Sequence, residues 1–158
     1  MSVLRAALVL TLLCAGPARA QSNAAAAALE GAWVRVTSIS PTGEETPSLP
    51  GVRTFVNGYY SWMQAPAGRA TVDSTATVTQ LRAVWGSVTA TSGRYEVVGH
   101  TLTQRPIVDR VPAAMTPDAY STFAYRLVAD TMWITQIANA ANAGPLVNQG
   151  SGKYVRVR

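Results

Sequence analysis

Short runs of alternating apolar and polar residues fill most of the chain after residue 29. In 31–39, GAWVRVTSI, aromatic and β-branched residues recur with the two-residue period of a strand that has one buried face. Runs of this kind recur along the chain and are separated by Gly, Pro, Asn and Asp. There are eight of them: 31–39, 52–56, 59–64, 94–98, 101–108, 120–128, 131–137 and 152–158. The pattern predicts eight β-strands.

The turns between these runs predict how the strands pair. Asn57-Gly58 separates the second and third runs, and both residues tolerate the positive φ of a type I′ hairpin turn. Gly99-His100 and Ala129-Asp130 join two further pairs in the same way. A sheet of eight strands tends to curl, and pairing its first strand with its last removes both edges. We therefore expect an all-β fold, an eight-stranded antiparallel up-and-down β-barrel.

One segment has a helical period instead. Within 73–93, apolar residues at Val78, Leu81, Val84, Trp85 and Val88 are spaced by three or four. We expect a short inserted helix near 75–88, capped by Asp73 or Ser74, with this apolar face against the barrel. The stretch 109–119 contains two prolines and is expected to be a loop with at most one helical turn.

The first twenty residues have the organisation of a secretory signal peptide. A basic residue (Arg5) precedes an apolar stretch and the small-x-small sequence Ala18-Arg19-Ala20. We expect cleavage after Ala20 and a periplasmic or secreted protein. Lipidation of Cys14 is the alternative, but Leu13 stands where a small residue would be expected. This organisation predicts a signal peptide (1–20), a flexible or loosely helical tether (21–28) and one barrel domain (29–158) with no stable membrane insertion.

Composition excludes several classes of function. Without Arg5 and Arg19, 11 basic residues remain of the 13 in the chain, against 8 acidic ones, a net charge of +3. The arginines are scattered, so a nucleic-acid partner is not expected. The chain after residue 20 has no Cys and a single His, which removes the usual metal ligands. No Gly-rich phosphate loop follows a strand. We predict no metal site, no cofactor and no catalytic residue, and interpret His100 as a turn residue.

Arginines and aromatic rings supply the candidate binding residues. Alternation places Trp33 and Arg35 on one face of the first strand and Val34 and Val36 on the other, and either face could be the inner one. An inward Arg35 would need a partner, either a carboxylate such as Glu96 or a bound anion. Arg126 suits a solvent-facing position. The rings suit either a ligand pocket or a filled core. The candidate ligand-binding residues are Arg35, Tyr60, Trp62, Tyr95, Arg126 and Trp133.

The chain resembles the bacterial lipocalin-like domain proteins over nearly all of 29–158. Gly31-Ala32-Trp33 matches the Gly-x-Trp sequence that opens lipocalins. Tyr59-Tyr60-Ser61-Trp62, the stretch 92–106 and the final Tyr154-Val155-Arg156 then follow in the order found in that family. The resemblance implies that Gly31, Trp33, Tyr154 and Arg156 close the barrel, with the arginine packed on Trp33. This chain differs in having Tyr154 where a Trp is common, and in lacking a Cys pair.

The function expected from this resemblance and from the aromatic content is binding of a small apolar or amphipathic molecule. A barrel enzyme (an isomerase, cyclase or hydrolase) is the first alternative, and would require an acid and a base that converge in the cavity. The second is an interaction module with a filled barrel, which an exposed apolar patch would favour. The sequence makes no prediction of oligomeric state.

Overall fold

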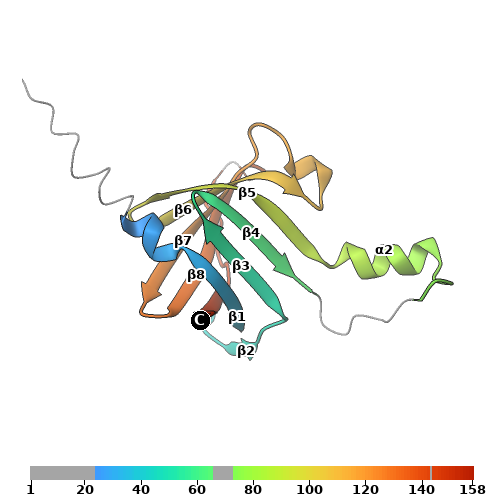
Figure 1. The fold of residues 1–158 in the computed structure, drawn as a ribbon, viewed down its shortest axis with the longest axis horizontal. Helices are drawn as coiled ribbons and strands as arrows, with labels where there is room; N and C mark the ends of the chain where they lie inside the picture. The colour runs from blue at the N-terminus through green and yellow to red at the C-terminus, as the bar shows by residue number, and fades with distance from the viewer. Residues whose placement is uncertain (1–23, 66–72, 143) are drawn as a thin grey trace, which may run out of the picture.

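The computed structural model describes residues 24–65, 73–142 and 144–158 and consists mainly of one closed sheet (Figure 1). The sheet order is β2-β1-β3-β4-β5-β6-β7-β8-β9, and β1 also pairs with β9. All pairings are antiparallel. The strands are β1 (Gly31–Ile39), β2 (Glu45–Pro47), β3 (Gly51–Val56), β4 (Tyr59–Gln64), β5 (Thr89–Val98), β6 (Thr101–Asp109), β7 (Ser121–Val128), β8 (Thr131–Asn139) and β9 (Ser151–Arg156).

Each of the eight predicted runs becomes a strand of the barrel, which confirms the predicted fold class. The hairpin turn between β3 and β4 is also confirmed, because Asn57 and Gly58 both have positive φ, at 49° and 78°. Two details differ. The fifth strand begins at Thr89 rather than at residue 94, because 89–93 pairs with β4 in continuous register. The exposed three-residue strand β2, which was not predicted, pairs with the end of β1.

Residues 24–29 are helical. The described part of the tether (21–28), which was expected to be flexible or loosely helical, is therefore helical. Ala25 and Ala26 pack against the core, and Leu29 is fully buried. Leu29 supplies the large apolar side chain that makes this short alanine helix an element of the fold. The predicted signal peptide and residues 21–23 lie outside the described residues.

The helix α2 (Val78–Gly86) forms where the apolar period predicts one, but it does not pack as predicted. Thr77, rather than Asp73 or Ser74, caps it, in a capping box with Gln80. The helix extends sideways from the barrel (Figure 1), and none of its residues is buried. Val78 and Trp85 are each 64% exposed. The expected burial of this face is therefore wrong, since a helical period does not specify which surface, if any, the helix packs on.

One end of the barrel is filled by its own side chains. The fully buried residues there are Leu29, Trp33, Phe55, Leu102 and Met132. Trp33 donates from its indole Nε1 to the Leu29 carbonyl at 2.8 Å, which attaches the short helix to β1. We call this the closed end of the barrel.

The closed end includes the place where the first and last strands meet. Trp33 pairs with Arg156 across β1 and β9, and the guanidinium carbon of Arg156 lies 4.2 Å from the centre of the Trp33 ring. The same guanidinium donates to the carbonyls of Ala28 and Glu30. Gly31 has φ of +119°, and a Cβ there would stand 3.0 Å from Arg156 Nη1. A side chain at residue 31 would therefore strain the backbone and crowd the arginine.

None of the helices in the described ranges is long and apolar enough to cross a bilayer.

Candidate functional site

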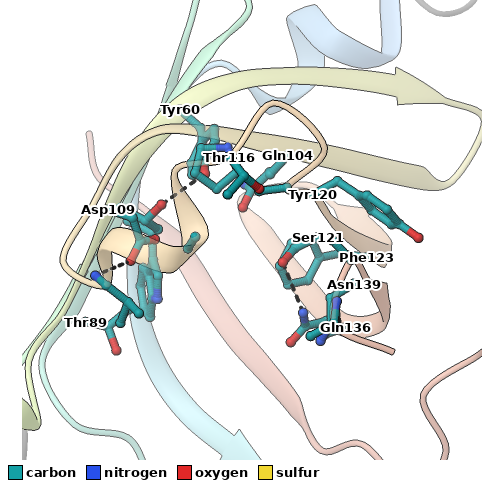
Figure 2. Close-up of a pocket in the computed structure, with 18 of the residues that line it drawn as sticks. Tyr60, Thr89, Gln104, Asp109, Thr116, Tyr120, Ser121, Phe123, Gln136 and Asn139 are labelled. Atoms are coloured by element: carbon teal, nitrogen blue, oxygen red, sulfur yellow. Dashed lines mark hydrogen bonds between the residues drawn. The ribbon is translucent and has the colours of Figure 1, made fainter. Parts of the chain in front are cut away.

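The end of the barrel opposite Trp33 contains a cavity of about 650 Å³, within the size range of small-molecule pockets. Figure 2 shows side chains from several strands and from the loop before β7 gathered around it. It is lined by Arg53, Tyr60, Trp62, Thr89, Thr91, Gln104, Pro106, Asp109, Val111, Ala113, Ala114, Thr116, Ala119, Tyr120, Ser121, Phe123, Gln136, Asn139, Ala140 and Ala141. We call this space the barrel cavity.

The loop between β6 and β7 forms one side of the barrel cavity. It contains a single 3-10 turn, η1 (Pro112–Ala114), which agrees with the predicted loop and its one helical turn. Asp109, at the end of β6, accepts a hydrogen bond from the Val111 amide at 2.8 Å and fixes the start of the loop. Ala119, at its end, is buried. The loop therefore contributes a largely apolar wall beside the inner faces of the strands.

Arg53 is a buried, charged side chain of the cavity wall. It was not among the predicted site residues. It lies on β3 opposite Trp33, so the two side chains share the inner face of the sheet. It is only 4% exposed. The guanidinium carbon lies 4.8 Å from the Trp62 ring centre, 5.3 Å from Phe123 and 5.7 Å from Tyr154. Its Nε and Nη1 have no hydrogen-bond partner in the described part of the chain.

The Trp62 ring that stacks on Arg53 also lies close to the backbone of β3 at Gly51. A Cβ on Gly51 would stand 2.6 Å from the Trp62 ring, so only glycine allows the indole to lie in this position. On its other side Trp62 meets Tyr154 edge to face, with ring centres 5.6 Å apart. Tyr154 therefore forms part of the wall behind Arg53, and its partner across β1 and β9 is Arg35 rather than Trp33.

Gln104 and Tyr60 are two of the polar side chains in the cavity wall, and they differ in whether they have hydrogen-bond partners. The Gln104 amide is buried, and its Nε2 has no hydrogen-bond partner among the described residues. The Tyr60 hydroxyl lies 3.1 Å from Thr91 Oγ1, within hydrogen-bond distance. Burial raises the pKa of Tyr60 above its usual value, against the lowering effects of the Thr91 hydrogen bond and the Arg53 charge. Tyr60 therefore stays neutral at physiological pH.

Of the predicted ligand-binding residues, the structure brings Tyr60 and Trp62 to the barrel cavity. Tyr95 is buried but lies in the closed end, edge to face with Phe55 at 5.0 Å, and it does not line the cavity. Burial raises its pKa.

Arg35 settles which face of β1 is inside. Val34 and Val36 are exposed, whereas Trp33 is fully buried and Arg35 partly so. Arg35 Nη1 donates to Gln64 Oε1 at 3.3 Å. The partner is not Glu96, which is exposed on the outer face of β5. Arg35 does not line the barrel cavity.

Arg126 and Trp133 are not in the barrel cavity at all. They pair across β7 and β8, where Arg126 is exposed and its guanidinium carbon lies 3.7 Å from the centre of the Trp133 ring. Met132 and Ile134, the neighbours of Trp133 on β8, are the buried residues. Alternation along β8 therefore turns Trp133 outward, so that it does not line the barrel cavity.

The titratable residues of the cavity wall are few. Arg53, Tyr60, Asp109 and Tyr120 line it. In the described ranges, no three His, Cys, Asp or Glu side chains gather as a metal site would require. His100 lies in the exposed turn between β5 and β6. A smaller hollow of about 210 Å³ beside His100 is below the size range of ligand pockets.

The fold and the cavity together define a class of protein: a closed up-and-down barrel of lipocalin-like architecture, filled at one end and hollow at the other. A structure comparison finds similarity to a lipocalin-like protein from Bacteroides uniformis ATCC 8492, with 12% sequence identity and a TM-score of 0.49, covering 82% of this chain and 99% of that one. The sequence matches no known family and no curated protein.

Proposed function

We propose that this protein binds a small amphipathic molecule in the barrel cavity. The observation that carries the proposal is the composition of the cavity wall. Rings from Tyr60, Trp62, Tyr120 and Phe123 line it together with two buried polar side chains, Arg53 and Gln104. An apolar pocket with a few convergent polar groups is typical of a small-molecule site. The rings would hold the apolar part of the ligand, and the polar groups would orient it.

Binding of N-phenyl-1-naphthylamine tests this proposal. This neutral dye fluoresces strongly in apolar surroundings, so its emission should rise and saturate on titration with the wild-type protein. Ser121→Trp would place a large ring in the cavity wall, from a residue that lines it on β7 (Figure 2). We expect it to weaken binding by at least about tenfold, equivalent to about 1.4 kcal/mol.

Ala124→Trp is the matched control. Ala124 lies three residues further along β7 and is exposed, so the same ring there should leave binding unchanged. Failure of the wild-type protein to bind the dye, or equal binding by the two tryptophan variants, would contradict the proposal.

We further propose that the protein works outside the cytoplasm as an unlipidated chain. The support is the sequence organisation of residues 1–20, which ends in Ala18-Arg19-Ala20. The intact mass of the exported protein should correspond to a chain that begins at Gln21. A diacylglycerol-modified Cys14 at its N-terminus would overturn this proposal.

A further inference from the structure

Arg53 is a buried cation that no acidic side chain in the described ranges neutralises. The ion pairs in the described ranges join Lys153 to Glu45, and Arg156 and Arg158 to Asp130. Asp109 is the acidic residue of the cavity wall, but it forms no ion pair with Arg53, and its carboxylate accepts the Val111 amide. A charge removed from water is costly unless it is paired and hydrogen-bonded.

Stacking on aromatic rings compensates only part of this cost. Trp62, Phe123 and Tyr154 offer the guanidinium their ring faces, which attract the charge. Rings accept no conventional hydrogen bond from Nε and Nη1, both of which are buried without a partner among the described residues. The three rings therefore contact the guanidinium, while its Nε and Nη1 remain without a hydrogen-bond partner among the described residues.

The buried polar atoms of the cavity wall that lack a hydrogen-bond partner among the described residues are all donors. Arginine has only donors, and the atom of Gln104 that lacks a partner is also a donor, its amide Nε2. Both side chains line the barrel cavity. A guanidinium presents its N–H groups in a planar fork that matches a carboxylate, sulfonate or phosphate. The group that would satisfy both side chains is an acceptor with negative charge.

Two other arginines show that Arg53 is distinct. Arg35 also faces inward and has a buried Nε without a partner among the described residues, but its Nη1 donates to Gln64 and it lies outside the cavity wall. Arg126 stacks on an indole ring as Arg53 does, but on the outer face, where water can solvate its donors. Arg53 combines ring stacking, burial and a place in the cavity wall.

We propose that the ligand of the barrel cavity carries an anionic headgroup, which binds to the guanidinium of Arg53 with Gln104 as a second donor, while its apolar part lies among the rings. This inference rests on the proposed function, since it assigns the chemistry of the same cavity. It identifies the ligand class as amphipathic anions.

A matched pair of dyes tests the headgroup separately from the cavity. The probe 8-anilino-1-naphthalenesulfonate has the ring skeleton of N-phenyl-1-naphthylamine and adds one sulfonate. Wild-type protein should bind the sulfonate at least about tenfold more tightly than the neutral dye. Arg53→Met should weaken sulfonate binding by at least about tenfold, and should weaken it far more than binding of the neutral dye.

Arg126→Met is the control for charge, because it removes one positive charge beside an indole ring on the outer face. It should change neither affinity. Ser121→Trp should weaken binding of both dyes, which would place the sulfonate in the cavity rather than on an exposed apolar surface.

The possible outcomes separate the two proposals. If the wild-type protein binds the neutral dye in the cavity but has no preference for the sulfonate, the inference fails while the proposed function stands. The inference fails equally if Arg53→Met and Arg126→Met have the same effect on sulfonate binding. If the wild-type protein binds neither dye, both proposals fail. If Arg53→Met does not fold, the wild-type preference and Arg53→Gln decide the question.

Discussion

Two arginines stack on indole rings inside this protein, and their surroundings give them different roles. Arg156 lies over Trp33 at the closed end, donates to two backbone carbonyls and lies 3.5 Å from Asp130. Arg53 lies against Trp62, and its Nε and Nη1 have no partner in the part of the chain that the structure describes. The donors of Arg156 have partners within the fold, so Arg156 should stabilise the protein. Nε and Nη1 of Arg53 lack such partners among the described residues, so we expect Arg53 to cost stability in the absence of a ligand.

A double-mutant cycle tests the role of Arg156. Trp33→Ala should cost about 3–5 kcal/mol, because it leaves a cavity in the core. Arg156→Ala should lose a cation–π contact of roughly 0.5–2 kcal/mol in addition to its hydrogen bonds. The two losses should not add, since each residue is the other's partner, and urea unfolding of all four proteins would give the coupling. Arg158→Ala is the control, because Arg158 contacts Asp130 rather than the ring. A coupling of zero for Arg156 would separate the arginine from the closure of the barrel.

The converse is predicted for Arg53. Replacing it with Met keeps an unbranched apolar chain among the rings and removes an unpaired charge, a change that is often neutral or stabilising. We expect Arg53→Met to raise the free energy of unfolding of the ligand-free protein by about 1 kcal/mol. A loss of more than about 1 kcal/mol in urea unfolding would indicate that the guanidinium holds the rings together and serves the fold.

Asp130 supplies a pH-dependent contact at the end of β9. Arg158 Nη2 donates to its carboxylate at 2.5 Å, and this hydrogen bond lowers the pKa of Asp130 below its ordinary value. A carboxyl with a lowered folded pKa stabilises the fold above its unfolded pKa, and this stabilisation is lost as the pH falls through the folded value. Arg158→Gln should therefore raise the pKa of Asp130, measured by carboxyl-carbon NMR. The pKa of Asp73, lowered by its hydrogen bond from the Thr75 hydroxyl, should not change. An unchanged pKa for Asp130 would contradict this assignment.

The elements of the barrel follow closely from the sequence, whereas the packing of α2 does not. A two-residue period predicts a strand and the residues that share one of its faces, although for β1 it left open which face is the inner one. A helical period predicts a helix but leaves its partner open. Val78, Leu81 and Trp85 of α2 are exposed, with Leu81 at 38%. The strand β2 was missed because ETP has no alternation to detect.

Leu81→Asp distinguishes a packed helix from the exposed one described here. In an exposed helix the change should alter the free energy of unfolding by no more than about 0.5 kcal/mol, as surface substitutions usually do. Leu102→Asp is the comparison, because Leu102 is fully buried and a charge there should cost several kcal/mol. A loss of several kcal/mol for Leu81→Asp would mean that α2 packs on the barrel in solution.

For the whole molecule, closure of the barrel could be predicted and the cavity could not. Eight strands in hairpin order bring β1 to β9 by topology alone. Whether the interior is filled depends on side-chain volumes and on the loop between β6 and β7, which no short-range pattern reveals. Arg53 could have been found from the sequence, because alternation places it on the same face as Phe55. What the sequence did not indicate is that it would be buried without a partner.

The four tryptophans lie in four different places, so their indole N–H signals report where on the protein a ligand binds. Trp33 is in the closed end, Trp62 lines the barrel cavity, Trp85 lies on α2 and Trp133 on the outer face of β8. Protein labelled with ¹⁵N-tryptophan, with signals assigned through Trp→Phe variants, would be titrated with 8-anilino-1-naphthalenesulfonate. Binding in the barrel cavity predicts a saturable shift of the Trp62 signal, while those of Trp85 and Trp133 stay in place. A shift of Trp85 or Trp133 with an unmoved Trp62 would show that the dye binds outside the barrel, and binding in the barrel cavity would be wrong.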